Sequence, residues 1–124
     1  MKDRLVFFVD DDKMILNLLE YTFKSRQGLR VKTFFSGEEC LQNLYMKPDL
    51  IVLDHVFQSG KRAMSGIEIL KKLKKLDKKV SVIVLSKHKD QELISEYMKN
   101  GASKYIPKED FFIDELIESI EDID

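Results

Sequence analysis

Five short apolar runs alternate with segments whose apolar residues recur every three or four positions, and this alternation most limits the folds open to the chain. The runs expected to form strands are residues 4–9, 29–35, 48–54, 80–86 and 103–107. The segments expected to form helices fall within residues 14–23, 36–45, 65–76, 93–98 and 112–120. Continuous apolar runs are typical of strands covered on both faces of a parallel sheet. The pattern predicts an α/β protein with helices on both faces of that sheet.

Polar residues mark where several of these helices begin and end. The sequences SGEE, starting at Ser36, and SGIE, starting at Ser65, place a glutamate three residues after a serine and predict capping boxes. Asn100 and Gly101 predict the end of the fourth helix. In the first helix, the residues that recur at helical spacing are Met14, Ile15, Leu18, Leu19, Thr22 and Phe23.

Length and composition favour a single domain, residues 1–124, with a core of its own. The net charge of −1, from 21 basic and 22 acidic residues, gives no basic field that would attract nucleic acid. The single cysteine excludes an internal disulfide and fits a reducing compartment. No apolar run approaches the length of a membrane span, and the first residues lack a signal-peptide core. We therefore expect a cytoplasmic protein that binds neither membrane nor nucleic acid.

Chemically active side chains follow four of the five expected strands. Asp10 and Asp11 follow the first strand, Asp54 ends the third, Ser86 ends the fourth and Lys108 follows the fifth. In parallel α/β sheets, ligands bind outside the carboxyl ends of the strands, near the point where the strand order reverses. The five side chains are therefore expected to meet at one edge of the sheet and to form the functional site.

The expected cluster suits phosphoryl chemistry that uses a metal. Adjacent carboxylates repel each other, and Mg²⁺, or Mn²⁺ in its place, would relieve that repulsion through oxygen ligands. The Asp54 carboxylate would attack phosphorus and form an acyl phosphate. The cation, the Lys108 ammonium and the Ser86 hydroxyl would then contact the phosphoryl oxygens.

Four motifs resemble those of response-regulator receiver domains of two-component signalling: VDDD at residues 9–12, DLIVLD at 49–54, VIVLS at 82–86 and GASKYIPK at 101–108. The resemblance extends over residues 4–121, in register with all five expected strands. It implies a flavodoxin-like, doubly wound (βα)5 fold with strand order 2-1-3-4-5. It also implies a cytoplasmic phosphoacceptor that is not a conventional enzyme, although it catalyses its own phosphorylation and slow autodephosphorylation.

The resemblance assigns roles to residues of the expected site. Asp54 matches the phosphoacceptor, which takes the phosphoryl group from a sensor histidine kinase or a phosphotransfer protein. Asp10 and Asp11 match the family's acid pair, and with Asp54 and the backbone carbonyl of Val56 they would bind the Mg²⁺. Lys108 matches the lysine that contacts the phosphoryl group.

The resemblance also implies a switch. Ser86 matches the switch hydroxyl, and Tyr105 matches the switch aromatic that fills the space opened when Ser86 moves. The alternative for Tyr105 is a rim aromatic with its hydroxyl in water. A downstream partner, or a second receiver, would bind the surface of the fourth helix, fifth strand and fifth helix, which is expected to include Tyr97, Met98, Tyr105 and residues 114–121.

Three stretches depart from the family's pattern. A four-residue insertion lengthens the segment after the phosphoacceptor, within residues 57–65. Lys87 follows Ser86 where the family has a small residue, and its side chain would either cover part of the site or reach into solvent. Glu109 rather than proline follows Lys108, so we expect a trans peptide bond there. These departures bear on the rate and geometry of switching.

Several residues also have purely structural readings. Asp12 fits a helix N-cap better than a metal ligand, and Cys40 fits a half-buried apolar residue. His55 should point to the opposite face of its strand from the preceding aspartate. His88 would either tune the lifetime of the phosphoryl group or have no role. The lysine-rich run 71–79 fits a solvated helix face better than a docking patch.

Two other functions compete with the phosphorylated receiver. The first is a degenerate receiver that binds its partner without phosphorylation, although all five site positions keep competent side chains. The second is a haloacid-dehalogenase-type phosphatase, in which Asp10 would be the nucleophile and Asp12 the acid. Against the phosphatase, the chain runs from Asp12 straight into a helix, which leaves no room for that family's hairpin flap. The chain is expected to be a stand-alone regulator or a receiver from a longer protein.

Overall fold

The computed structural model describes residues 3–54 and 65–122. Its strands are β1 (Arg4–Val9), β2 (Leu29–Phe34), β3 (Leu50–Asp54), β4 (Ser81–Ser86) and β5 (Lys104–Pro107). Its helices are α1 (Lys13–Phe23), α2 (Gly37–Gln42), α3 (Gly66–Leu76), α4 (Gln91–Lys99) and α5 (Phe112–Glu121), with a short 3-10 helix, η1 (Leu44–Met46), after α2. The predicted strands and helices are confirmed, with small shifts at their ends.

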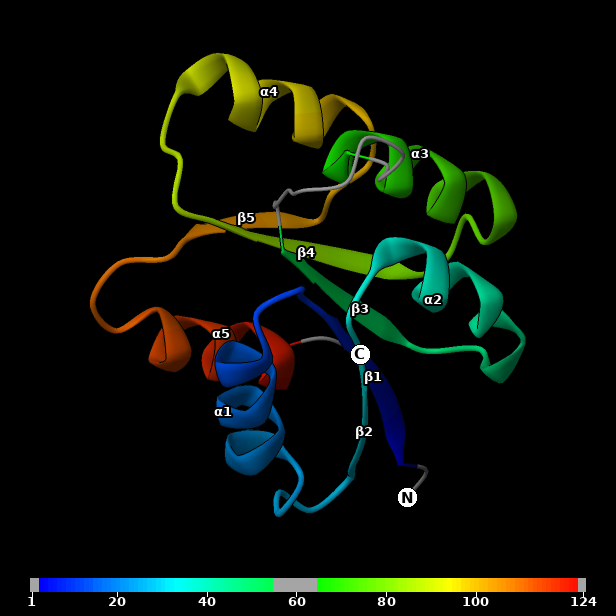
Figure 1. Ribbon diagram of the computed structural model, residues 1–124, viewed down its shortest axis with the longest axis vertical. Coiled ribbons are helices and arrows are strands. Elements are labelled where there is room, and N and C mark those ends of the chain that lie inside the picture. Colours follow the sequence, from blue (N-terminus) through cyan, green and yellow to red (C-terminus); the bar gives the residue numbers. More distant parts are fainter. Residues whose placement is uncertain (1–2, 55–64, 123–124) are drawn as a thin grey trace.

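The five strands form one parallel sheet in the order β2-β1-β3-β4-β5. Helices α2, α3 and α4 cover one face of the sheet, and α1 and α5 cover the other (Figure 1). The doubly wound arrangement and its strand order are therefore as expected. The order reverses between β1 and β3, so the crevice that receives ligands in such sheets lies at the carboxyl ends of these two strands.

The central strand β3 supplies side chains to a core on each face of the sheet. Ile51 and Leu53 belong to the core under α2, α3 and α4, and Leu50 and Val52 belong to the core under α1 and α5. All four are at most 2% exposed. This burial on both faces explains the continuous apolar run that the strand shows in the sequence.

The two predicted capping boxes form to different extents. At Ser65 the box is complete, because the serine hydroxyl accepts from the Glu68 N–H and the glutamate accepts from the Ser65 N–H. At Ser36 the hydroxyl accepts from the Glu39 N–H, but the Glu39 carboxylate accepts from the Phe35 N–H instead of the capping residue's own. The second helix is also shorter than predicted, because η1 replaces its last turn.

Helix α1 packs on the sheet through only some of its apolar residues. Leu16, Leu19 and Phe23 are buried, whereas Met14 is 80% and Leu18 is 45% exposed. Apolar residues occur on two sides of this helix, so periodicity did not fix which side would pack. Met14 and Leu18 therefore leave the helix with an exposed apolar stripe.

Two further residues lie deeper than expected. Tyr97 was expected on the binding surface of α4, but it is 0% exposed and is the buried residue of that helix, while Met98 is 43% exposed as expected. A helix with so few apolar residues needs this ring to anchor it to the sheet. Cys40 is fully buried rather than half-buried, and burial raises the pKa of its thiol to about 12.

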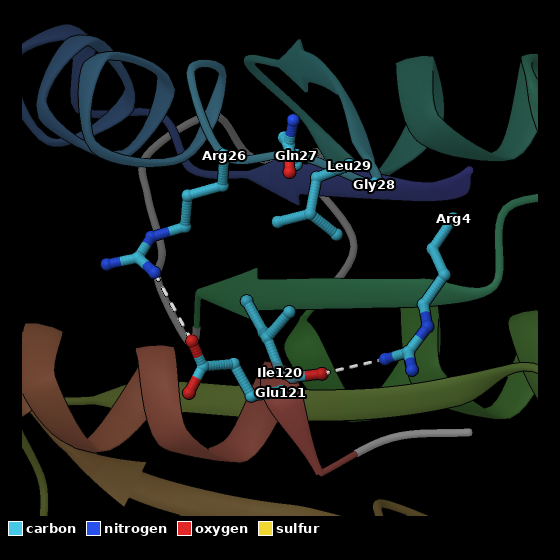
Figure 2. A pocket seen from close by; sticks show the side chains of 7 residues that line it. All are labelled: Arg4, Arg26, Gln27, Gly28, Leu29, Ile120 and Glu121. Carbon is cyan, nitrogen blue, oxygen red and sulfur yellow. Dashed lines mark hydrogen bonds and ion pairs between the residues drawn. The ribbon is translucent and has the colours of Figure 1, made fainter. Parts of the chain in front are cut away.

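The end of α5 is fastened to the opposite edge of the sheet from the expected site (Figure 2). The Arg4 guanidinium, from the start of β1, donates to the Ile120 carbonyl at 3.0 Å. Arg26, from the turn after α1, pairs with Glu121 at 3.3 Å. These residues line a cavity of about 470 Å³ at the amino ends of the strands. No helix in the described ranges has the length and apolar character needed to cross a bilayer.

Candidate functional site

Three aspartates gather at the carboxyl ends of β1 and β3, the strands between which the order reverses. Asp10 directly follows β1 and is 3% exposed, and Asp54 ends β3 and is 7% exposed. Asp11 is exposed at the mouth of the site. One carboxylate oxygen from each of the three lies within 4.8 Å of the others. The parallel sheet thus brings together the acids that the sequence pattern singled out.

Lys108 faces this cluster from the segment after β5. Its Nζ forms an ion pair with Asp54 Oδ1 and lies 3.3 Å from Asp10 Oδ2. Its backbone N–H donates to the Ser86 carbonyl at 2.6 Å, which ties the end of β5 to the end of β4. The described residues contain no cis peptide bond, so the Lys108–Glu109 bond is trans, as expected.

Burial changes the protonation of this site. It raises the pKa of Asp54 to about 7, with a further rise from the Asp10 charge, and Lys108 opposes both. Burial also raises the pKa of Asp10, against the hydrogen bond from Asp12 and the charge of Lys108. Burial alone would lower the pKa of Lys108, but its contacts with Asp54 and Asp10 outweigh that effect and raise it. Two buried carboxylates therefore share one ammonium.

The donor set suits a divalent cation. Three carboxylates against one ammonium leave two negative charges in excess when all are ionised. Carboxylate oxygens are the ligands that hard cations prefer, and such a cation would take the place of the proton that Asp54 otherwise retains near neutral pH. The described residues could therefore hold a metal ion. The predicted ligand Val56 and the neighbouring His55 lie outside the described residues, as does most of the expected insertion 57–65.

Asp12 is a helix cap, in agreement with its structural reading. Its carboxylate accepts from the Met14 N–H at 2.9 Å at the start of α1. Its own backbone N–H donates to Asp10 Oδ1 at 2.8 Å. The cap therefore also fixes the orientation of the buried acid, a contact that no sequence pattern indicated.

The loop after β4 joins Ser86 to Tyr105 through backbone groups. Ser86 is fully buried, and its Oγ accepts from the His88 N–H at 2.9 Å. The Tyr105 hydroxyl donates to the His88 carbonyl at 2.7 Å. Tyr105 is half-buried, and this bond gives its hydroxyl a protein partner at the surface. Lys87 is exposed, so of the two expectations for its side chain the structure favours solvent.

The contact of Tyr97 with Tyr105 near the site was not predicted from the sequence. The ring of Tyr97 lies 5.8 Å from the ring of Tyr105, centroid to centroid, at an interplanar angle of 51°. The sequence had placed both residues on an exposed surface. The signal that would have found the contact is the spacing of Leu93 and Tyr97, which puts both on one face of α4.

A twisted parallel sheet with an acid cluster, a lysine and a hydroxyl at its carboxyl edge defines the class of phosphoacceptor signalling domains. The model of the family described as "Response regulator receiver domain" matches residues 6–121. The chain therefore belongs to the receiver domains of two-component response regulators. Its function is that of a receiver domain, a class whose members exchange phosphoryl groups with histidine kinases or phosphotransfer proteins.

Known relatives include both long and short proteins. The chain is 32% identical over 121 residues to the DNA-binding transcriptional regulator NtrC of Escherichia coli K12. This match covers 98% of the chain but only 25% of NtrC. It is 30% identical over 121 residues to sporulation initiation phosphotransferase F of Bacillus subtilis, with 97% of this chain and 93% of that protein covered. The chain thus spans a quarter of one curated relative and nearly all of another.

A solved structure supports the fold assignment. The structure of the BeF3-activated receiver domain of DrrB, from Thermotoga maritima, matches with a TM-score of 0.81 and 28% identity. The match covers 96% of both chains.

The raised pKa of Asp54 predicts an unusual dependence of stability on pH in metal-free protein. Because the folded-state pKa of about 7 exceeds the ordinary 3.8, the stability that Asp54 contributes is complete below the unfolded value and is lost as pH rises through about 7. From pH 5 to pH 8, the unfolding free energy of wild type should fall relative to Asp54→Asn by on the order of 1 kcal/mol per pH unit near neutrality.

Urea unfolding in EDTA at several pH values measures this slope. The exposed Asp110→Asn serves as the control and should keep the wild-type slope. Equal slopes in wild type and Asp54→Asn would show that Asp54 is ionised throughout this range.

Proposed function

We propose that residues 1–124 form a single receiver domain that accepts a phosphoryl group on Asp54, in the cytoplasm, from a sensor histidine kinase or a phosphotransfer protein. The observation that carries this proposal is the position of Asp54. It ends the central strand, and its carboxylate lies beside two other acids and the Lys108 ammonium. A nucleophile there has both a site for a cation and a cationic side chain next to it.

The chemistry follows from these contacts. An oxygen of ionised Asp54 attacks phosphorus, the new P–O bond forms, and the bond from phosphorus to the donor breaks, its electron pair leaving with the donor. Lys108, which pairs with Asp54, then pairs with an oxygen of the transferred group. The Ser86 hydroxyl donates to another phosphoryl oxygen. A bound Mg²⁺ supplies charge neutralisation and keeps Asp54 ionised.

The structure gives reasons against the two competing functions. Helix α1 begins at Lys13, directly after Asp12, so no flap separates the first strand from the first helix as a haloacid-dehalogenase-type phosphatase requires. Asp12 is engaged as the helix cap instead of facing Asp10 as a proton donor. Against a degenerate receiver, Asp54 and Lys108 keep the side chains and the contact that phosphoryl transfer uses.

Acetyl phosphate with Mg²⁺ should add a single phosphate to the wild-type chain, and Asp54→Asn should abolish the adduct because it removes the nucleophile. Intact mass spectrometry measures the product. Asp49→Asn, on a carboxylate that accepts from the Leu5 N–H far from the site, is the control and should retain the adduct. An adduct that persists in Asp54→Asn but disappears in Asp10→Asn would favour the phosphatase, and no adduct in wild type would favour the degenerate receiver.

We infer that Asp10, Asp11 and Asp54 bind one Mg²⁺, with Mn²⁺ as a substitute, and that the Val56 carbonyl completes the protein ligands. The support is the approach of three carboxylates at one edge of the sheet and their excess of negative charge over Lys108. Mg²⁺ keeps several waters and needs few protein ligands, which suits a site with one exposed acid at its mouth.

Millimolar Mg²⁺ should raise the melting temperature of wild type by several degrees, because a ligand that binds only the folded state stabilises it by about 1.4 kcal/mol at ten times its dissociation constant. The rise should be much smaller in Asp11→Asn, although this variant should be more stable than wild type in EDTA. Asp12→Asn is the matched control: asparagine also caps helices, and Asp12 is outside the cluster. A full response in Asp11→Asn would remove Asp11 from the ligands.

The surface next to the site suits the protein that donates the phosphoryl group. Met14, just after the acids, is 80% exposed, and Phe111, three residues after Lys108, is 79% exposed. Leu18 extends the apolar stripe along α1. A donor must cover the mouth of the site to reach Asp54, and exposed apolar side chains beside a mouth mark a protein contact. We therefore place the kinase or phosphotransfer protein over α1 and the segment before α5.

We place the downstream partner, or a second receiver, on α4, β5 and α5. Helix α5 presents Asp114, Glu115 and Glu118 to solvent, and Met98 is exposed on α4. When the phosphoryl group draws the Ser86 hydroxyl inward, the hydrogen bond that the His88 N–H donates to Ser86 Oγ changes. The start of α4 follows this loop, so the new charge would shift the surface on which the partner binds.

Beryllofluoride stands in for the phosphoryl group in a test of this coupling. Its addition with Mg²⁺ should shift backbone amide resonances in the loop 86–90 and in α4. Ser86→Ala should keep phosphorylation of Asp54 largely intact but reduce the distant shifts severalfold, because the hydroxyl that links the two is gone. Ser103→Ala, on the exposed turn before β5, is a control that should respond like wild type. Shifts confined to the acids and Lys108 in wild type would show that α4 is not coupled.

A further inference from the structure

Strand β2 is an edge strand of the sheet, and among the described residues it pairs with β1 alone. An edge strand directs alternate peptide N–H and carbonyl groups outward, where another strand can bind them. Charged side chains often protect such an edge from unwanted pairing. Here the charge has one sign, because β2 reads LRVKTF and contains Arg30 and Lys32 but no acid. The edge therefore favours a strand of opposite charge.

Three side chains of β2 lie on one face of the strand, at alternate positions: Arg30, Lys32 and Phe34. Their partners across the ladder belong to the core under α2, α3 and α4, and they are Leu5, Phe7 and Val9. Only Phe34 is buried, at 7% exposed, whereas the two basic residues are exposed. This face of the edge strand therefore presents two basic side chains and then an apolar one.

A cavity of about 440 Å³ lies beside this face, between the end of β2 and the segment from α2 to η1. Its lining includes Lys32, Phe34, Phe35, Glu39, Tyr45 and Met46. Two of the lining residues are aromatic side chains at the surface, since Phe35 is 51% and Tyr45 is 76% exposed. Glu39, the acid of this lining, accepts from the Phe35 N–H at 2.9 Å. Exposed aromatic side chains around a cavity are typical of a protein contact.

We propose that the outer edge of β2 is a docking site for an extended, acidic segment of a partner protein, which pairs with β2 as an additional strand. On the side that faces α2, the segment carries acidic residues across from Arg30 and Lys32. Its next side chain on that side is large and apolar, and it enters the cavity beside Phe34 and Tyr45. Backbone pairing supplies affinity, and the two charges and the cavity select the segment.

This site goes beyond the proposed receiver function. It does not use Asp54, and the strand order puts β2 and β5 at opposite edges of the sheet. A partner on β2 and a partner on α4, β5 and α5 can therefore bind the same molecule together.

Two synthetic peptides of opposite direction are the probes for this site. In each, two acidic residues and a phenylalanine alternate with threonine, in the order acid, acid, phenylalanine in one peptide and in the reverse order in the other. Each is titrated into 15N-labelled protein in EDTA, with no phosphoryl donor. At least one peptide should shift the amide resonances of β2 and of residues 43–46 and saturate at millimolar concentration. The resonances of β5, at the other edge of the sheet, should not move.

Two substitutions test the charge and the aromatic side chain separately. Lys32→Glu replaces attraction by repulsion and should weaken binding about tenfold. Tyr45→Ala should also weaken binding about tenfold, because interface aromatics contribute strongly to affinity. Both side chains are exposed, so both variants should fold. Lys79→Glu and Tyr21→Ala make the same changes at exposed positions outside the site, and as matched controls they should keep wild-type affinity.

Several outcomes would overturn the inference. One is the absence of a saturable shift with both peptides, and another is unchanged affinity in Lys32→Glu or in Tyr45→Ala. Equal binding of a peptide with the same composition in scrambled order would reduce the contact to unspecific charge attraction. Proline cannot donate to a ladder, so a peptide in which prolines replace the threonines should not bind, and its binding would contradict strand pairing. Because all these measurements are made without phosphorylation, they decide this site whether or not Asp54 accepts a phosphoryl group.

Discussion

The rest of this structure depends on one interaction, in which the buried carboxylates of Asp10 and Asp54 share the single ammonium of Lys108. Asp10 and Asp54 can be this close because β1 and β3 are neighbours in a parallel sheet, so that their carboxyl ends meet. Burial, together with the Asp10 charge that Lys108 balances only in part, raises the pKa of Asp54 to about 7. The surrounding backbone is organised to hold this unfavourable arrangement: the Asp12 N–H orients Asp10, and the Ser86 carbonyl holds the Lys108 segment.

The sequence predicted the parts of the molecule that are governed by period and topology. The buried run that ends at Asp54 is typical of a central strand, and parallel strands bring their terminal side chains to one edge of the sheet. The rotation of each helix about its own axis, which decides the residues that face the sheet, was harder to predict from the sequence. Leu16 proved buried and Leu18 exposed, because several apolar faces were available and only packing against α5 and the sheet selects among them. Tyr97 was misplaced for the same reason, and its contact with Tyr105 depends on that rotation.

Backbone groups of residue 88 carry part of the connection between Ser86 and Tyr105, beside a direct hydrogen bond between the two side chains. Both hydrogen bonds of the backbone part use the peptide N–H and carbonyl of residue 88. These two hydrogen bonds use only backbone groups of residue 88, so neither depends on the side chain of Lys87. This explains how the chain accommodates Lys87, which departs from the family's pattern of a small residue and extends into solvent. What the link does require is the spacing of two residues from Ser86 to His88.

The buried thiol of Cys40 can report on local opening of the core between α2 and the sheet. Cys40 is 0% exposed, and its pKa of about 12 leaves almost no thiolate to react in the closed protein. Because it is the only cysteine in the chain, every thiol modification must follow an event that separates α2 from the sheet. When a thiol reagent is concentrated enough to react faster than the core recloses, the labelling rate of the native protein measures how often that part of the core opens.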